Sequence, residues 1–232
     1  MAATDLLPRP RGHRLETLLA QANLFFDLPL RLRSRLIILL AALLLLPTFS
    51  FPLWRMAFYS NQFPDGLNLY IYSHSLEGGK TTARDDLREI NTLNHYIGMR
   101  PLLESDFSEF KWIPLMIGIF FILALRTIVI GKMSNLVDTA VLFMYFGLFS
   151  FWSFYNRLYQ YGHNLDPTAP VKVQPFMPPL IGSKQIANFT VYSYPGAASY
   201  FMIAFWLLLA FAIVLSAGRT EQPQATSPAS GS

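Results

Sequence analysis

Four long runs of apolar residues dominate the hydrophobic pattern of the chain. Crossing the hydrocarbon core of a membrane takes about 20 mostly apolar residues, and each run is close to that length. Backbone groups cannot stay unpaired in lipid, so the runs predict transmembrane helices, and their continuity excludes the alternating pattern of a membrane barrel. The predicted spans are residues 36–54, 112–130, 136–155 and 200–217.

Two long segments, residues 55–111 and 156–199, separate these spans. Residues 67–75 alternate between apolar and polar positions like a strand, and residues 82–97 have helical spacing. Residues 186–194 alternate again, and we expect them to pair with the strand at 67–75. Each segment alone is too small to build a core easily, so we predict that the two pack together. The expected fold is an all-α membrane domain of four helices with a small extracytoplasmic α+β cap.

Basic residues determine the predicted orientation of the spans. Arg31 and Arg35 lie directly before the first span, so the positive-inside rule places residues 1–35 in the cytoplasm. Four spans return the chain to the same side. The short turn at 131–135 and the tail at 218–232 are therefore expected in the cytoplasm, and both long segments are expected outside.

The N-terminal segment carries a shorter apolar pattern of its own. Its apolar residues follow helical spacing, with polar residues on the opposite face. The pattern predicts an amphipathic helix on the inner membrane surface, with a partner-binding helix as the alternative. The tail contains Ser, Pro and Gln without a periodic apolar pattern, which predicts disorder. The apolar residues of the helix are Leu15, Leu18, Leu19, Ala22, Phe25 and Phe26.

Composition supports the membrane assignment and narrows the chemistry. The chain is 53% hydrophobic and 14% charged, whereas soluble domains are about 25% charged. The net charge is +4, and the basic residues concentrate beside apolar runs, which indicates membrane orientation rather than nucleic-acid binding. There is no cysteine, which excludes a disulfide scaffold, a thiolate metal centre and a cysteine nucleophile.

Histidines and a methionine in the two outer segments are the candidate metal ligands: His74, His95, Met99 and His163. Imidazole with thioether suits copper, especially Cu(I). No compact ligand spacing is present, so surface or hydrogen-bonded histidines are the alternative reading. A GxSxG nucleophile elbow is also absent from the sequence, and we predict a protein without catalytic residues, not an enzyme.

Two stretches of the outer segments resemble a known family. The first is residues 90–99 (INTLNHYIGM), and the second is residues 161–167 (YGHNLDP), followed by 178–182 (PPLIG) and 185–189 (QIANF). Together they resemble an uncharacterised family of small four-span bacterial membrane proteins. That family is associated with copper-enzyme maturation genes, chiefly those that serve nitrous oxide reductase.

The resemblance implies an integral protein of the bacterial inner membrane, and the basic residues described above place both termini in the cytoplasm. The protein would assist maturation of a periplasmic metalloenzyme, or deliver copper to it. Its partners would be membrane lipid and a periplasmic copper protein or chaperone, or other membrane subunits. The family motifs contain His95, Met99 and His163, which are therefore the first candidate copper ligands; His74, outside the motifs, is the next candidate. A shared copper site requires these side chains to converge. The alternatives are a non-catalytic structural subunit of a larger membrane complex and, last, a small transporter subunit, since the spans hold few polar groups.

Overall fold

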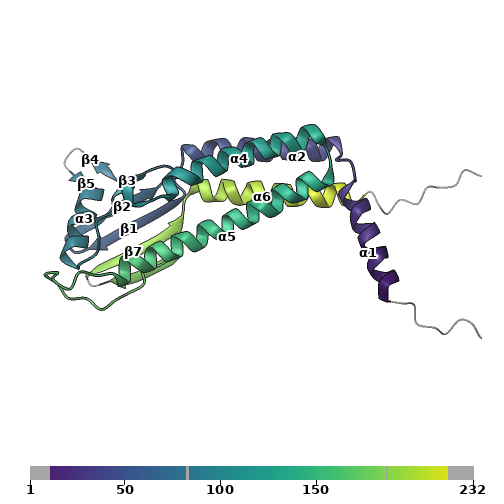
Figure 1. The fold of residues 1–232 in the computed structure, drawn as a ribbon. Coiled ribbons are helices and arrows are strands. Elements are labelled where there is room, and N and C mark those ends of the chain that lie inside the picture. The colour runs from purple at the N-terminus through teal and green to yellow at the C-terminus, as the bar shows by residue number, and fades with distance from the viewer. Residues whose placement is uncertain (1–10, 82–83, 187, 219–232) are drawn as a thin grey trace, which may run out of the picture.

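Four helices form the body of the molecule, and a small antiparallel sheet caps one end of it (Figure 1). The computed structural model describes residues 11–81, 84–186 and 188–218. Four helices are long and apolar enough to cross a membrane, which confirms that part of the predicted architecture. They are α2 (Leu32–Leu45, extended by the 3-10 turn Leu46–Phe49), α4 (Glu109–Ile130), α5 (Met133–His163) and α6 (Ala197–Ala217).

Two of these helices end where the predicted spans end, and two do not. The first, α2, ends with its 3-10 turn at Phe49, short of the predicted end at Trp54, because Trp54 already belongs to a strand. Helices α4 and α6 end at Ile130 and Ala217, the predicted last residues of their spans. Helix α5 continues to His163, past the predicted span end at Tyr155. Hydropathy falls after Tyr155, but Leu158 and Tyr161 are buried and keep the helix packed against the cap.

The helix expected at the N-terminus is present as α1 (Arg11–Phe26). Leu15, Leu18 and Leu19 are exposed, whereas Phe25 packs against the bundle core. The tail predicted to be disordered lies outside the described residues, apart from its first residue, Gly218.

A short connection ties α1 to the turn between α4 and α5. The Leu30 amide donates to the Gly131 carbonyl oxygen at 2.7 Å, and the Met133 amide donates to the Leu28 carbonyl oxygen at 2.9 Å. Gly131 ends α4 in the left-handed conformation, with φ of 68°, which glycine adopts without steric cost. This turn is therefore held at the end of the bundle opposite the cap.

The five-stranded sheet contains segments from both long connections, so the two connections pack together. Its order is β3-β2-β1-β7-β6, and every pair is antiparallel. We predicted that residues 186–194 pair with the strand at 67–75. That pairing is wrong, because β1 lies between them and bonds to both. The strands are β1 (Trp54–Ser60), β2 (Phe63–Ile71), β3 (Leu76–Gly78), β6 (Gly182–Ile186) and β7 (Phe189–Pro195).

Helix α3 (Asp86–Tyr96) lies beside the sheet and follows a two-stranded pair, β4 (Lys80–Thr81) and β5 (Arg84–Asp85). Asp85 caps its N-terminus by accepting the Leu87 amide at 3.1 Å. Asp86 is buried, accepts the Asn68 amide of β2 at 2.8 Å and pairs with Arg84 at 2.7 Å. These contacts anchor the start of α3 to the sheet.

Candidate functional site

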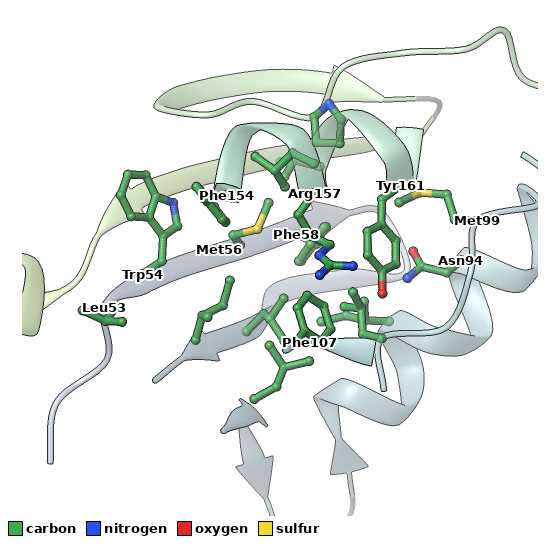
Figure 2. A pocket seen from close by; sticks show the side chains of 18 of the residues that line it. Leu53, Trp54, Met56, Phe58, Asn94, Met99, Phe107, Phe154, Arg157 and Tyr161 are labelled. Carbon is green, nitrogen blue, oxygen red and sulfur yellow. The ribbon is translucent and has the colours of Figure 1, made fainter. Parts of the chain in front are cut away.

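A cavity of about 870 Å³ lies between one face of the sheet and the helices that cover it. Alternate residues of β1, namely Trp54, Met56 and Phe58, line its floor. The other walls come from α3, the first turns of α4 and α6, and the C-terminal half of α5 (Figure 2). The cavity therefore spans the junction of cap and bundle.

Strand register explains why this face of the sheet is apolar. Met56 lies opposite Leu69 of β2, and Phe58 lies opposite Leu67 and, on its other side, Val191 of β7. Successive side chains of a strand point to opposite faces, so these residues share the cavity face. A strand from the first connection and one from the second thus contribute to the same wall.

The opposite face of the sheet carries tyrosines and an arginine. Tyr59 packs edge-on against Tyr192 with ring centroids 5.6 Å apart, and the Arg55 guanidinium lies 5.8 Å from the centre of the Tyr70 ring. Tyr59, Tyr192 and Tyr194 are exposed. We call Arg55, Tyr59, Tyr70, Tyr192 and Tyr194 the tyrosine face.

A partly buried ion pair between Arg157 and Glu109 forms part of one wall of the cavity. A terminal nitrogen of Arg157 donates to both carboxylate oxygens of Glu109, at 2.9 and 3.1 Å, and the Ser153 hydroxyl donates to the same carboxylate at 2.8 Å. The Phe107 ring lies 5.2 Å from the Arg157 guanidinium and stacks on Tyr161 with centroids 6.0 Å apart. Ser153, Arg157 and Tyr161 are spaced by four residues on α5, which places them on one side of the helix.

Asn94 of α3 is the most buried polar side chain on the cavity wall, with 7% of its surface exposed. Within the described part of the chain, its side-chain amide has no hydrogen-bond partner. Figure 2 shows Asn94, Tyr161 and Met99 at one end of the cavity, and Leu53 and Trp54 at the other. One end is therefore polar, and the end nearest the bundle is apolar.

Tyr72 adds a further hydroxyl to the cavity lining. Burial, and next the negative charge of Glu77, raise the pKa of the Tyr72 phenol above its ordinary value. The phenol therefore stays protonated at neutral pH and can donate a hydrogen bond.

The two stretches that carry the family resemblance meet at the end of the cap away from the bundle. The Asp166 amide donates to the Gly98 carbonyl oxygen at 2.8 Å, and the Val171 amide donates to the Tyr96 carbonyl oxygen at 3.0 Å. We call this contact, between residues 96–98 and 166–171, the seam. Gly98 has φ of 79°, and a Cβ there would lie 2.8 Å from the Asp166 carbonyl oxygen, so the seam needs glycine at this position.

A second glycine allows a further close approach next to the seam. The Phe176 amide donates to the Gly162 carbonyl oxygen at 3.0 Å. A Cβ on Gly162 would clash with the Phe176 carbonyl oxygen. Two glycines of the stretches with family resemblance thus have structural explanations.

The predicted ligands His95 and Met99 point to different surroundings. His95 is exposed and shares a shallow depression on α3 with Arg88 and Asn91. Met99 instead lines the cavity, because α3 ends at Tyr96 and the backbone turns at Gly98. Their one-turn spacing therefore does not place them on one side.

His95 nevertheless lies near the second stretch. The Asp166 carboxylate accepts the hydroxyl of Thr168 at 2.6 Å and its amide at 2.8 Å. These two bonds lower the pKa of Asp166 below its ordinary value, with smaller contributions from the charges of Lys172 and His95. The seam thus brings one predicted ligand, His95, close to a carboxylate of the second motif.

The remaining two histidines are held by their own neighbours. His163 bonds to the Tyr159 carbonyl oxygen through Nδ1 at 3.0 Å and stacks on the Tyr159 ring with centroids 3.8 Å apart. His74 is exposed, with Nδ1 3.4 Å from the Ser73 hydroxyl. Among residues 11–81, 84–186 and 188–218, no three His, Asp or Glu side chains group in a way that could hold a metal ion. The copper site stays a prediction.

The polar residues of the cavity wall were not among the predicted site residues. Asn94 follows Ile90 by four residues and is therefore a polar residue on the apolar face of α3, a pattern visible in the sequence. Arg157 and Tyr161 have helical spacing too, but they lie beyond the predicted span. Their meeting with Asn94 depends on the packing of α5 against the cap.

Comparisons of the chain with protein-family models, with curated proteins and with solved structures gave no match. The resemblance described above therefore remains an expectation.

Proposed function

We propose that the protein is a membrane-integral accessory protein, not an enzyme, that assists maturation of a periplasmic metalloenzyme or delivers copper to it. In this proposal both termini lie in the cytoplasm of a bacterial cell and the cap faces the periplasm. The observation that carries the proposal is the seam, because it brings the two stretches with family resemblance together at the tip of the cap.

The seam offers few donor atoms, which favours transfer over storage of copper. His95 is exposed beside the Asp166 carboxylate, whereas Met99 lies beyond the end of α3 with its side chain on the cavity. A soft thioether and an imidazole suit Cu(I), but Met99 would have to turn out of the cavity to join His95. Such an incomplete donor set would hold the ion loosely enough to pass it to a partner protein with a more complete ligand set.

A Cu(I) competition titration tests this proposal. Detergent-purified protein would compete with a chromogenic chelator under reducing conditions, beside His95→Ala, Met99→Ala and His163→Ala. We expect binding by wild type that is weakened at least tenfold in His95→Ala. Met144→Ala is the matched control, because Met144 is exposed on α5 within the bundle. A folded wild type that binds no Cu(I), or equal losses in Met144→Ala and Met99→Ala, would remove the copper role.

A second candidate is a non-catalytic subunit of a larger membrane complex, and the tyrosine face favours it. Tyrosine and arginine are enriched at the centres of protein interfaces. Under this proposal a partner subunit covers Tyr59, Tyr192 and Tyr194. Affinity purification from native membranes in mild detergent would recover a stoichiometric partner with wild type and lose it with Tyr192→Ser. Recovery of the protein alone would count against this candidate.

The transporter alternative gains no comparable observation. Buried hydroxyls of the bundle bond to one another, as in Ser216 with Ser34 at 2.7 Å and Thr127 with Thr139 at 3.2 Å. Such paired groups stabilise helix contacts and are not available to coordinate a substrate.

A further inference from the structure

The cavity has the size and chemistry of a binding site for a small molecule. Its volume of about 870 Å³ lies within the range of roughly 300–1,000 Å³ that ligand sites occupy. Such sites are mostly apolar, with a few convergent polar groups that orient the ligand. Aromatic and aliphatic side chains of the sheet and helices supply the apolar wall, and Asn94, Arg157 and Tyr161 supply polar groups.

Asn94 offers its side-chain amide to the cavity. An amide carries both donors and an acceptor, so a ligand head in the cavity can bond to it. The Asn94 side chain is more than nine-tenths buried, and no group in the described residues bonds to its amide. Figure 2 shows this amide at the end of the cavity where the Tyr161 hydroxyl also lies.

Arg157 has hydrogen-bonding capacity to spare at the same wall. One terminal nitrogen is occupied by Glu109, while the described residues offer no acceptor to Nε or to the other terminal nitrogen. A guanidinium carries five N–H donors. Glu109 compensates its charge, so the remaining donors suit a neutral or singly charged acceptor better than a doubly charged phosphate.

The apolar end of the cavity reaches helices that are long enough to cross a membrane. Ile113 of α4, Phe151 of α5 and Ile203 of α6 line the cavity, and Phe151 and Ile203 are also exposed on the helix surface. An amphiphilic ligand dissolved in the membrane could therefore enter the cavity sideways between these helices. Its polar head would then lie toward the cap, and its apolar tail would stay at the bundle.

We infer that the cavity binds a membrane amphiphile with one apolar chain and a head that presents carbonyl or carboxylate oxygens. The head accepts hydrogen bonds from the Asn94 amide and the free N–H groups of Arg157. It lies near the Tyr161 hydroxyl, which donates to the Pro101 carbonyl oxygen at 3.4 Å. The apolar chain of the ligand lies against Met56, Phe154 and the turns of the bundle nearest the cap. Two sources share this chemistry, a fatty acid and an isoprenoid quinone.

Two glycines make a matched pair of variants for the test. Gly147 of α5 lines the cavity, whereas Gly118 of α4 is not part of its lining. A Cβ at either position meets nothing within 4 Å, so a larger side chain can start from both sites without a clash at Cβ. Both substitutions also replace a helical glycine by a better helix former. Gly147→Leu should block the cavity, and Gly118→Leu should leave it open.

Equilibrium binding of tritiated palmitate and of a tritiated decylbenzoquinone to the full-length protein in detergent is the measurement. We expect saturable binding of at least one probe by wild type and by Gly118→Leu, and at least a tenfold loss of affinity in Gly147→Leu. Competition by the unlabelled probes distinguishes the two sources. Binding of neither probe, or equal binding by the two leucine variants, would overturn the inference.

The head position is tested separately from the cavity. Asn94→Leu should weaken binding of the preferred probe at least tenfold and leave binding of tritiated hexadecane, which has no head, unchanged. Arg157→Lys keeps a positive charge beside Glu109 but removes the spare guanidinium N–H groups, and it serves as a second variant should Asn94→Leu fail to fold. Equal effects on the probe and on hexadecane would show that these residues do not contact a head. None of these results depends on whether the protein handles copper.

Discussion

The bundle and the cap each have an apolar core, but the cavity borders most of the cap core and only the cap-side end of the bundle core. Alanines such as Ala41, Ala124 and Ala212 are fully buried in the bundle core, and small residues let helices approach closely. Larger rings fill the remaining space, as Phe205 does against Phe143 with centroids 4.6 Å apart. The cap core is built around Met56, Leu67, Leu69, Leu76, Ile90 and Val191.

The two cores also treat their polar groups differently. In the bundle, buried hydroxyls are paired, as in Ser34 with Ser216. On the cap side, the buried hydroxyls of Ser60 and Ser75 have no partner among the described residues. Dense packing with paired polar groups stabilises a fold, whereas a void with unpaired donors costs stability unless a ligand fills it. We therefore expect the bundle to contribute most of the stability of the fold, and the cap to contribute the ligand-binding residues.

Truncating one aromatic ring in each core should give the largest difference in stability between the two regions. Phe205→Ala should lower the free energy of unfolding by about 3–5 kcal/mol, because it opens a void in dense packing. Phe154→Ala should cost only about 1 kcal/mol, since this half-buried ring borders a cavity that already exists. Unfolding by SDS in detergent micelles, followed by circular dichroism, measures both. Equal losses would show that the cap is packed as densely as the bundle.

An ion pair also stabilises the cap. Substitution of the adjacent residues Asp86 and Asp85 distinguishes the contribution of this ion pair from that of helix capping. Asp86→Ala should cost about 3 kcal/mol, because it leaves Arg84 and the Asn68 amide without their partner. Asp85→Ala removes only the N-cap of α3 and should cost about 1 kcal/mol. The same unfolding assay measures both losses. A milder effect for Asp86→Ala than for Asp85→Ala would contradict this account.

Two serines test whether polar pairing really differs between the cores. Ser216→Ala should destabilise the protein by about 0.6 kcal/mol, because the Ser34 hydroxyl loses its partner. Ser75→Ala removes a buried hydroxyl that no described group satisfies, and it should be neutral or stabilise the protein by up to about 1 kcal/mol. Only Ser216→Ala should therefore lower the free energy of unfolding. A clear loss in Ser75→Ala would reveal a partner for this hydroxyl and weaken the comparison.

The same contrast explains how far sequence reasoning reached. Length and hydropathy are local properties, so the four apolar helices were predictable, and Ile130 and Ala217 were correct ends. Strand β1 was not predicted, because Trp54 was assigned to the first apolar run and concealed the start of its alternation. The partner of β7 depends on long-range packing that no local pattern encodes.

The site was harder to predict than the fold, for a related reason. Cavity residues such as Asn94 and Arg157 come from elements far apart in the chain, and each has ordinary neighbours in sequence. The resemblance drew attention to residues 90–99 and 161–167, which the structure does bring into contact. Yet Gly98 and Gly162 in these stretches are explained by close backbone packing, so motif membership alone does not make a residue a ligand.

The smallest expected effect is a pH response at the seam. Two hydrogen bonds from Thr168 lower the pKa of Asp166, so the ionised carboxylate stabilises the folded state. This contribution is present above the unfolded pKa of about 3.9 and is lost as the pH falls through the lower folded value. The amides of Asp166 and Ala169 should therefore lose protection against hydrogen exchange, relative to the intrinsic exchange rate, only in that acidic range. The amides of α6 should stay protected. In Asp166→Asn the seam amides should lose this acid response, and an unchanged response would place the titrating group elsewhere in the cap.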